Sequence, residues 1–222
     1  VYFMARNKYP QETIDLILKQ ALELFIEKGY DNTSIQDIID NLGGLSKGAI
    51  YHHFKSKEEI FEGVCGKLGA ENTDYYNKIR DDRTKNGYEK LKAVVRSAYA
   101  NPNNQVLLSM SGHIMSDPKF LMAQIKGSYE IVAPFYIEPI IRQGVLDGSL
   151  KTDHPKELAE VIITLINVWL NPMIIASSTA ELKGKLEFFD ILLKGVGVDL
   201  FDQEIMEQYL SYCQQYDGVR SK

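Results

Sequence analysis

The feature of this 222-residue sequence that most restricts its fold is a helical spacing of apolar residues, which continues almost from end to end. Apolar residues step by three or four through residues 14–25, and the same step returns in residues 35–42, 60–68, 91–99 and 182–193. This step matches the period of an α-helix, whereas a half-buried β-strand alternates between apolar and polar residues. Because no convincing alternation is present, the sequence predicts an all-α fold of about nine or ten helices.

Local signals predict where several helices begin and end. Gly29 is typical of the glycine that follows a helix C-terminus. Residues 33–36, Thr-Ser-Ile-Gln, are typical of a capping box at the start of a second helix. Ser46, Ser56 and Ser178 are expected to cap three later helices.

Prolines shape the expectations for the middle of the chain. A helix is expected at residues 106–115, and Asp117 followed by Pro118 predicts the start of another. That helix should be kinked or interrupted at Pro134 and Pro139, because proline removes a backbone donor and clashes with the preceding turn.

Composition indicates a soluble globular protein, with 45% hydrophobic and 25% charged residues. No run of 18 apolar residues is present, so no membrane helix is predicted. Cys65 and Cys213 are expected to be inert structural thiols in a reducing cytoplasm, and no metal or cofactor site is predicted. Residues 1–3 precede Met4, which we expect to be the natural start, and no signal peptide is expected.

The charge distribution is compatible with nucleic acid although the net charge is −5. Residues 1–57 hold seven basic and seven acidic residues, so the remainder of the chain carries the whole negative excess. Within the neutral segment the basic residues lie mostly at its two ends, in the N-terminal arm and after residue 46. A local basic footprint of this kind suits phosphate contacts.

Residues 33–54 have the pattern helix, glycine turn, helix, which is typical of a DNA-binding helix-turn-helix. The second helix must be short and exposed on one face, because a B-DNA major groove admits one α-helix. Ile50 and Phe54 are spaced to anchor this helix to a core. The residues left on its other faces are Lys47, Gly48, Ala49, Tyr51 and His52.

The string around this helix resembles the recognition-helix signature of the TetR family of ligand-responsive regulators, over about residues 10–65. The resemblance implies a three-helix DNA-binding domain, expected at 4–56, and a helical effector-binding and dimerisation domain at 57–222. It further implies a homodimer that represses genes until a small molecule releases it from operator DNA. The matching string is Leu45-Ser46-Lys47-Gly48-Ala49-Ile50-Tyr51-His52-His53-Phe54-Lys55-Ser56-Lys57-Glu58-Glu59-Ile60.

The resemblance also implies which residues contact DNA. Thr33, Ser34 and Lys57 match positions that contact phosphate in the family, and His53 is expected to be packed or solvated. The turn departs from the family pattern, because Gly43-Gly44 stands where one glycine is usual, so the placement of the recognition helix is open. The predicted DNA-binding residues are Thr33, Ser34, Ser46, Lys47, Gly48, Ala49, Tyr51, His52 and Lys57.

Methionine and aromatic residues concentrate in the middle of the chain and predict an effector cavity for a flat, apolar or aromatic molecule. For any single one of these residues, a place in the ordinary core is the competing interpretation. The candidate effector-binding residues are Met110, His113, Met115, Phe120, Tyr129, Tyr136 and Trp169.

Residues 153–178 are expected to form one long helix, bent near its end by Pro172. It is apolar on more than one face, so it is either central to the monomer or meets a second subunit. The resemblance favours a four-helix interface with the helix around residues 182–193. The candidate interface residues are Leu158, Ile162, Leu165, Leu182, Leu186 and Phe189.

Two alternatives to an effector-released repressor differ in what they require of the sequence. A helical enzyme with a chance helix-turn-helix would need a nucleophile, base or metal set, and the sequence shows no recognisable one. A regulator that acts constitutively, or that activates transcription, is compatible with every motif described above.

Overall fold

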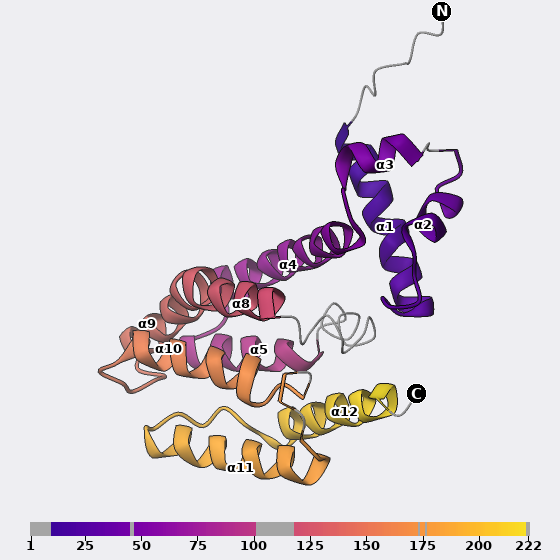
Figure 1. Ribbon diagram of the computed structural model, residues 1–222. Coiled ribbons are helices and arrows are strands. Elements are labelled where there is room, and N and C mark those ends of the chain that lie inside the picture. The colour runs from indigo at the N-terminus through magenta and orange to yellow at the C-terminus, as the bar shows by residue number, and fades with distance from the viewer. Residues whose placement is uncertain (1–9, 45–46, 101–117, 173, 176, 221–222) are drawn as a thin grey trace, which may run out of the picture. The chain divides into compact units, whose positions relative to one another are not determined.

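The computed structural model describes residues 10–44, 47–100, 118–172, 174–175 and 177–220, and within these ranges every regular element is a helix (Figure 1). The predicted all-α fold is therefore confirmed. The chain divides into two compact units, one of residues 1–71 and one of residues 72–222, and each is described by itself.

The first unit contains helices α1 (Pro10–Lys28), α2 (Ile35–Asn41), α3 (Lys47–His53) and the beginning of α4 (Lys57–Asp81). The apolar stripes predicted from the sequence all point into one core. The buried residues of this core are Ile17, Leu18, Ala21, Leu24, Phe25, Tyr30, Ile38, Leu42, Ile50, Ile60, Phe61, Val64 and Leu68.

The first part of α4 belongs to this unit, so the division falls after Glu71 and not after residue 56 as expected from the sequence. The physical reason is aromatic packing. The ring of Phe61 in α4 lies 5.8 Å from that of Phe25 and 5.2 Å from that of Tyr30, centroid to centroid. Since removing α4 would expose this cluster, the three-helix domain is complete only with the start of the fourth helix.

The capping signals locate most helix ends correctly, but they place the start of α2 one residue too early. Gly29 adopts φ 79°, as expected after a helix C-terminus. Ser178 and Glu181 form the reciprocal capping box of α11. At α2 the N-cap is Ser34 and not Thr33, because the Ser34 hydroxyl accepts from the Asp37 amide. The predicted cap Ser46 lies outside the described residues.

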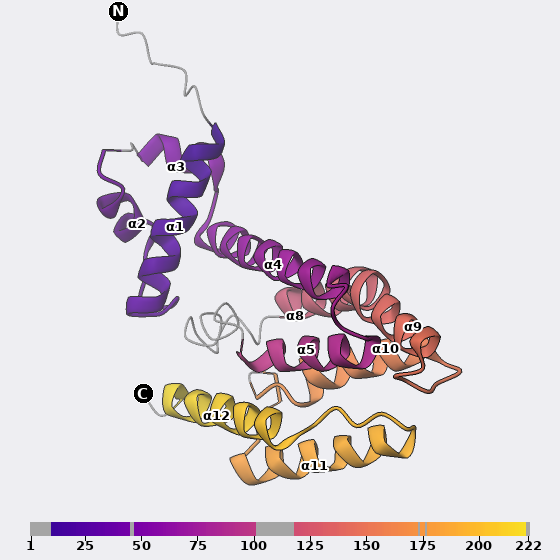
Figure 2. The same cartoon turned by 180° about the vertical axis from the view of Figure 1, so that it is seen from behind.

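The second unit contains the rest of α4, then α5 (Gly87–Ala100), α8 (Pro118–Gly127), α9 (Glu138–Asp147), α10 (Pro155–Thr164), α11 (Thr179–Gly195) and α12 (Gln203–Arg220). Figures 1 and 2 show α5 between the run α8–α9 on one side and α11 with α12 on the other. Helix α5 packs directly on α9 and α12. Its buried residues are Gly87, Lys90, Leu91, Val94, Val95, Ser97 and Tyr99.

Two π-helical segments lie in this unit, η1 (Ser128–Ile137) and η2 (Leu165–Trp169). Pro134 lies inside η1 and Pro139 in the first turn of α9, so the chain continues as helix through both prolines with a widened turn instead of breaking. The predicted helix at residues 106–115 lies outside the described residues.

The prediction of one helix over residues 153–178 is wrong at both ends. Helix α10 begins at Pro155, and helical structure stops after η2, where the Leu170 amide donates to the Leu165 carbonyl at 2.8 Å. The end is explained by Pro172, because the residue before a proline is disfavoured in the α conformation.

The start of α5 is held against the end of α9 by a close backbone approach. A Cβ atom at Gly87 would lie 2.1 Å from the backbone nitrogen of Gly144. The amides of Gly87 and Tyr88 donate to Asp147 Oδ2 at 2.9 Å and to Ser149 Oγ at 3.0 Å. Donors at the N-terminus of α5 are thus satisfied by the end of another helix, and a side chain at Gly87 has no room.

We therefore expect Gly87→Ala to lower the free energy of unfolding by about 3 kcal/mol, because the added methyl meets backbone that cannot yield. The matched change Gly127→Ala adds its methyl in open space. It should stabilise the chain by about 0.5–1 kcal/mol. Urea unfolding of both variants measures the difference, and equal midpoints would contradict the assignment.

Candidate functional site

One face of α3 is exposed and offers polar and small side chains. Ile50 is fully buried and fixes α3 to the core, and the Phe54 amide closes its end by donating to the Ile50 carbonyl at 2.9 Å. Residues 47, 48, 51 and 52 are exposed, and this spacing places them on one side of the helix. A short helix anchored on one side and bare on the other meets the steric requirement of the major groove.

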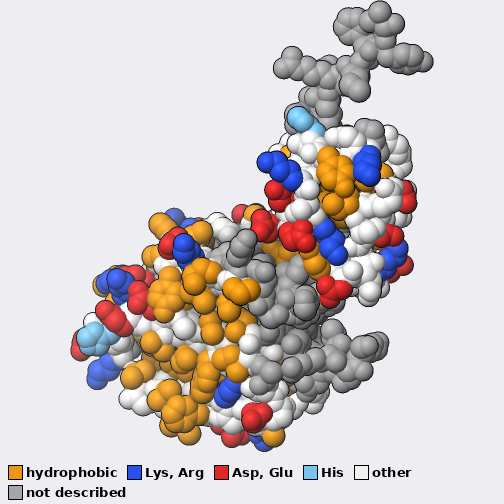
Figure 3. All heavy atoms as spheres, in the orientation of Figure 1, with side chains coloured by type: hydrophobic (Ala, Val, Ile, Leu, Met, Phe, Trp, Pro, Cys, Tyr) orange, Lys and Arg blue, Asp and Glu red, His pale blue; other side chains and the backbone are white. Residues whose placement is uncertain are grey.

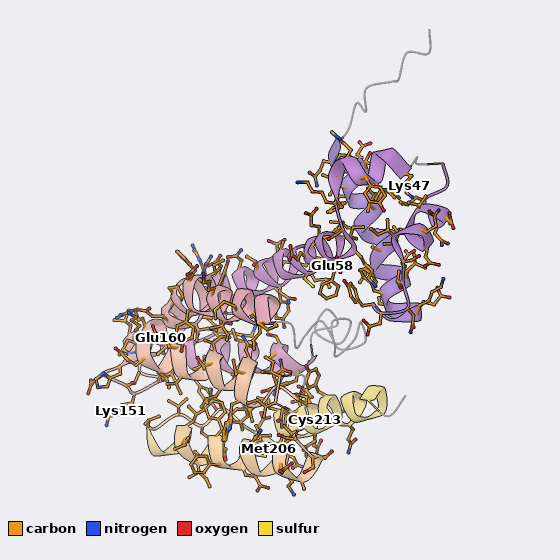
Figure 4. The ribbon with its side chains drawn as sticks, viewed as in Figure 1. Lys47, Glu58, Lys151, Glu160, Met206 and Cys213 are labelled. Carbon is orange, nitrogen blue, oxygen red and sulfur yellow. The ribbon has the colours of Figure 1, made fainter. Side chains whose placement is uncertain are left out.

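The exposed face of α3 carries one cation and several hydrogen-bonding groups. The Lys47 ammonium lies 5.8 Å from the centre of the Tyr51 ring, and Tyr51 is 42% exposed (Figure 4). The rings of His52 and His53 meet edge to face at 5.1 Å. Gly48 is exposed and Ala49 half-buried, so neither adds bulk that would hold the helix backbone away from a ligand.

The turn before α3 requires glycine at two successive positions. Gly43 adopts φ 57° and Gly44 adopts φ 121°, and the second value is one that residues with a side chain rarely adopt. The doubled glycine is therefore a conformational requirement of this turn. Ser46, predicted to contact DNA, lies outside the described residues.

The two predicted phosphate contacts at the start of α2 differ in what they can offer. Thr33 is 1% exposed, and its hydroxyl lies 2.8 Å from the Gly29 carbonyl and 3.3 Å from that of Leu24. This side chain holds the α1–α2 turn, and its predicted phosphate contact stays a prediction. Ser34 is exposed.

Ser34 and Asp37 form a tight pair at the N-terminus of α2. The Ser34 amide donates to Asp37 Oδ2 at 2.8 Å, and the Ser34 hydroxyl also donates to that oxygen. Hydrogen bonding from the hydroxyl and then from the amide lowers the pKa of Asp37 from 3.8 to about 2. The carboxylate also lies 3.4 Å from the Lys28 ammonium at the end of α1.

Lys57, the third predicted phosphate contact, is partly engaged within the protein. Its ammonium donates to the Tyr30 carbonyl at 2.9 Å and lies 4.1 Å from the centre of the Tyr30 ring. An ammonium has three N–H donors, so a phosphate contact remains a prediction for the others. This bond could not be predicted from local sequence patterns, because Lys57 and Tyr30 are far apart in the chain.

The second unit holds a cavity of about 210 Å³ between α8–η1 and α10–η2. Of the seven candidate effector residues, Tyr129 is the one found among the described residues that line it. Met110, His113, Met115 and the side chain of Phe120 lie outside the described residues. The lining residues are Leu121, Gln124, Ile125, Ser128, Tyr129, Ile163, Thr164, Asn167, Val168 and Ile174.

The other two predicted effector residues make contacts elsewhere. The Tyr136 ring packs on that of Tyr76 at 5.6 Å and lies 5.4 Å below the Arg80 guanidinium. The Trp169 ring meets that of Phe188 at 6.2 Å. A concentration of aromatic residues in the sequence does not indicate which of them face a cavity.

The predicted dimer residues are mostly core residues of the monomer, which corrects that expectation. Five of the six are less than 9% exposed, and Leu165 is partly buried against the same cluster. The exposed side of α11 carries instead Phe188, Ile191 and Leu192, which are 52%, 64% and 46% exposed. Figure 3 shows hydrophobic side chains gathered over the face where α8, α10 and α11 lie. We call Phe188, Ile191 and Leu192 the α11 apolar face.

Neither cysteine is placed for chemistry. Cys213 is fully buried. The pKa of Cys65 is raised to about 12, mainly because the thiol is buried and to a smaller extent because the negative charge of Glu62 lies nearby. Within the described residues no group of three histidine, cysteine or acidic side chains is arranged to hold a metal ion. The described helices also include none with the length and apolar content required to cross a membrane.

Part of the first unit matches a known family model. Residues 17–64 match the model of the family described as bacterial regulatory proteins, tetR family. This segment contains α2, α3, the glycine turn and the beginning of α4. The match therefore covers the exposed face of α3 and the whole aromatic cluster of Phe25, Tyr30 and Phe61.

Similarity to individual proteins extends over most of the chain. The HTH-type transcriptional repressor KstR2 of Mycolicibacterium smegmatis is 28% identical over 84% of this chain and 92% of its own length. The repressor AcnR of Corynebacterium glutamicum is 24% identical over 84% of this chain and 95% of its own. The crystal structure of a TetR-family regulator from Pectobacterium atrosepticum superposes with TM-score 0.62 at 21% identity, covering 86% of this chain and 97% of that one.

The Ser34–Asp37 pair can be tested by two measurements, the stability of the first unit and the pKa of Asp37. Ser34→Ala should destabilise the first unit by about 1 kcal/mol through loss of the N-cap, and Ser34→Gly by only a few tenths. Both should raise the pKa of Asp37 toward 3.8, as measured by NMR titration of its carboxyl carbon. Because this pKa is depressed in the folded state, its contribution to stability is present above pH 3.8 and is lost as the pH falls through about 2. An unchanged pKa in both variants would refute the pairing.

Proposed function

We infer that this chain, which belongs to the tetR family of bacterial regulatory proteins, is a transcriptional repressor that binds operator DNA and is released by a small molecule. The observation that carries the inference is the exposed face of α3 within the segment that matches the family. The chain is a regulator and not an enzyme, as its relatives indicate.

DNA recognition is assigned to α3 in the major groove. The Lys47 ammonium supplies charge for a phosphate, and the Tyr51 hydroxyl and the His52 ring supply hydrogen bonds for phosphates or base edges. Gly48 and Ala49 allow the helix backbone to approach the duplex. Thr33 acts through the α1–α2 turn that it holds, and Ser34, which is exposed at the start of α2, is assigned a phosphate contact.

Homodimerisation is assigned to the α11 apolar face. A monomer in water would leave Phe188, Ile191 and Leu192 between 46% and 64% exposed on adjacent turns of one helix, which is unfavourable for a soluble protein. Pairing of two copies across this face would cover it. A symmetric dimer would also present two α3 helices to half-sites about one helical turn, roughly 34–36 Å, apart.

Release by an effector requires two states of the dimer with different affinity for DNA. The second unit offers a cavity, and α4 is shared between the two units, so it joins the cavity-bearing unit to the DNA-binding unit through one helix. A coupling of about 1–3 kcal/mol would change operator affinity roughly 5- to 150-fold, and operator would weaken the ligand by the same factor. We place this regulation in the cytoplasm, where the operator is.

Two substitutions in α3 distinguish the contribution of charge to DNA affinity from the contribution of sequence recognition. Lys47→Ala should weaken binding to every sequence and reduce the slope of log affinity against log salt by about 1, because one phosphate contact is lost. Tyr51→Phe should cost about 1 kcal/mol on the preferred operator and less on random DNA, because only a hydroxyl is removed.

The operator is first selected from a library of random duplexes, and affinities are then measured by fluorescence anisotropy at several salt concentrations. Lys67→Ala is the matched control, since Lys67 is an exposed lysine of α4 paired with Asp15. If Lys67→Ala weakened binding as much as Lys47→Ala, the role of α3 would be disproved.

The dimer is tested by placing a charge on the α11 apolar face. Ile191→Lys should produce monomers at micromolar concentration and reduce operator affinity at least about tenfold, since a buried unpaired ammonium is strongly unfavourable. Because Ile191 is 64% exposed in the monomer, the variant should keep its fold. Leu146→Lys, at an 88% exposed site in α9, is the control and should remain dimeric in sedimentation. A dimeric Ile191→Lys protein would exclude this interface.

A further inference from the structure

The walls of the cavity in the second unit are largely apolar. Leu121 and Ile125 come from α8, Ile163 from α10, and Val168 and Ile174 from η2 and the segment that follows it. At about 210 Å³ the cavity is larger than an engineered cavity of roughly 150 Å³ that holds benzene. It is smaller than the pockets of roughly 300–1,000 Å³ that take drug-sized ligands. It therefore suits a molecule of about one ring.

A first polar pair lies on the cavity wall. Asn167 Nδ2 donates to Ser128 Oγ at 3.0 Å, and Ser128 Oγ donates to the Gln124 carbonyl at 2.9 Å. Ser128 is 6% exposed, so this pair is largely removed from solvent. A side-chain amide has two N–H donors and an acceptor oxygen, so the bond to Ser128 does not exhaust the capacity of Asn167.

A second polar pair can either donate or accept. Thr164 Oγ1 lies 2.8 Å from the Tyr129 hydroxyl and 2.6 Å from the Glu160 carbonyl. The carbonyl can only accept, so when Thr164 donates to it the Tyr129 proton points to Thr164 and the phenol oxygen keeps its lone pairs. When Thr164 turns its proton to Tyr129, the phenol proton becomes available. This pair can therefore match a hydroxyl or a carbonyl group.

The polar residues are brought to the cavity by irregular helix. Ser128 and Tyr129 are the first residues of η1, and Asn167 lies in η2. A π-helical turn leaves the regular i→i−4 ladder and redirects side chains, and such turns occur frequently at functional sites. Both π-helical segments described in this unit thus contribute polar groups to one cavity.

The described lining residues include no acidic or basic side chain and no histidine. A charged ligand would lose its hydration in the cavity without gaining a partner of opposite charge. A neutral ligand with one polar group would lose little, because the two polar pairs replace its hydrogen bonds with water.

We propose that this cavity binds an uncharged molecule of about one ring that carries a single hydroxyl or carbonyl group, held by Tyr129 with Thr164 and by Asn167 with Ser128. The proposal rests on the proposed function, because it names the chemical class of the effector. It excludes carboxylates, phosphates and amines as ligands of this cavity.

The test compares three probes of similar size by isothermal titration calorimetry on the full chain. p-Cresol carries a ring and one hydroxyl, toluene lacks the hydroxyl, and benzoate carries a charge. We expect p-cresol to bind more tightly than toluene by roughly 2- to 10-fold, the contribution of about one hydrogen bond. Benzoate should bind at least about 100-fold more weakly than p-cresol. Benzoate binding as tight as that of p-cresol would overturn the proposal.

Two variants with matched controls locate the binding. Tyr129→Phe should remove the preference for p-cresol over toluene, whereas Tyr75→Phe should keep it, since Tyr75 is similarly exposed but lies in α4. Val168→Phe should fill the cavity and reduce p-cresol affinity at least about tenfold. Val145→Phe, the same change at an exposed site in α9, should leave it unchanged. Retained p-cresol affinity in Val168→Phe would place the ligand elsewhere and refute the proposal.

Operator binding is measured in parallel and keeps the two hypotheses apart. If p-cresol binds with the expected variant pattern while operator affinity is unaffected, the cavity proposal is supported and release by this class of ligand is refuted. If no probe binds in the cavity while α3 variants still lose operator affinity, the cavity proposal fails and the DNA-binding function stands.

Discussion

The packing of Tyr30 against the start of α4 is the interaction on which the rest of the DNA-binding unit depends. Its ring lies 5.4 Å from that of Phe25 and 5.2 Å from that of Phe61, and its hydroxyl donates to Glu58 Oε1 at 3.1 Å. Its carbonyl accepts from Lys57 at 2.9 Å. One residue of the α1–α2 turn thereby fixes the first turn of α4, and α3 occupies the chain between these two fixed points.

This arrangement explains why the family match and the compact unit both extend past the helix-turn-helix. A short helix such as α3 has little stability of its own, because helices of this length are marginal in water. Its position depends on Ile50 in the core and on α4 closing that core through Phe61. The exposed face of α3 is consequently supported from both ends.

Sequence patterns predicted the helical fold and the exposed face of α3, because both depend mainly on residues that are neighbours in the sequence. Ile50 had to face the core, and Gly29 and Ser178 had to mark helix ends, because spacing and capping are properties of neighbouring residues. The interface residues could not be assigned in this way. Phe189 and Phe188 are adjacent and both apolar, yet the first is fully buried and the second 52% exposed. Only the packing of α11 on the rest of the unit decides between the two faces.

Long-range polar contacts were equally beyond sequence reasoning. Thr33 and Lys57 both match phosphate-contacting positions, but the hydroxyl of the first and one donor of the second are used by carbonyl groups of the α1–α2 turn. The cavity was predicted from methionine and aromatic content, and of those candidates Tyr129 lines it. Ser128 and Asn167 are further polar residues of the lining that this content did not indicate, and π-helical segments hold all three. No sequence pattern used above predicts π-helical turns.

The state of the two cysteines bears on how motion in this molecule could be followed. Cys213 is fully buried and therefore inaccessible to an alkylating dye, and because the pKa of Cys65 is raised to about 12, very little Cys65 thiolate is present at neutral pH. A cysteine introduced at an exposed position of α3 or α9 would then be labelled almost alone in the natural background. In the proposed dimer, resonance energy transfer between such labels would report the separation of the two DNA-binding units directly, without removing either native thiol.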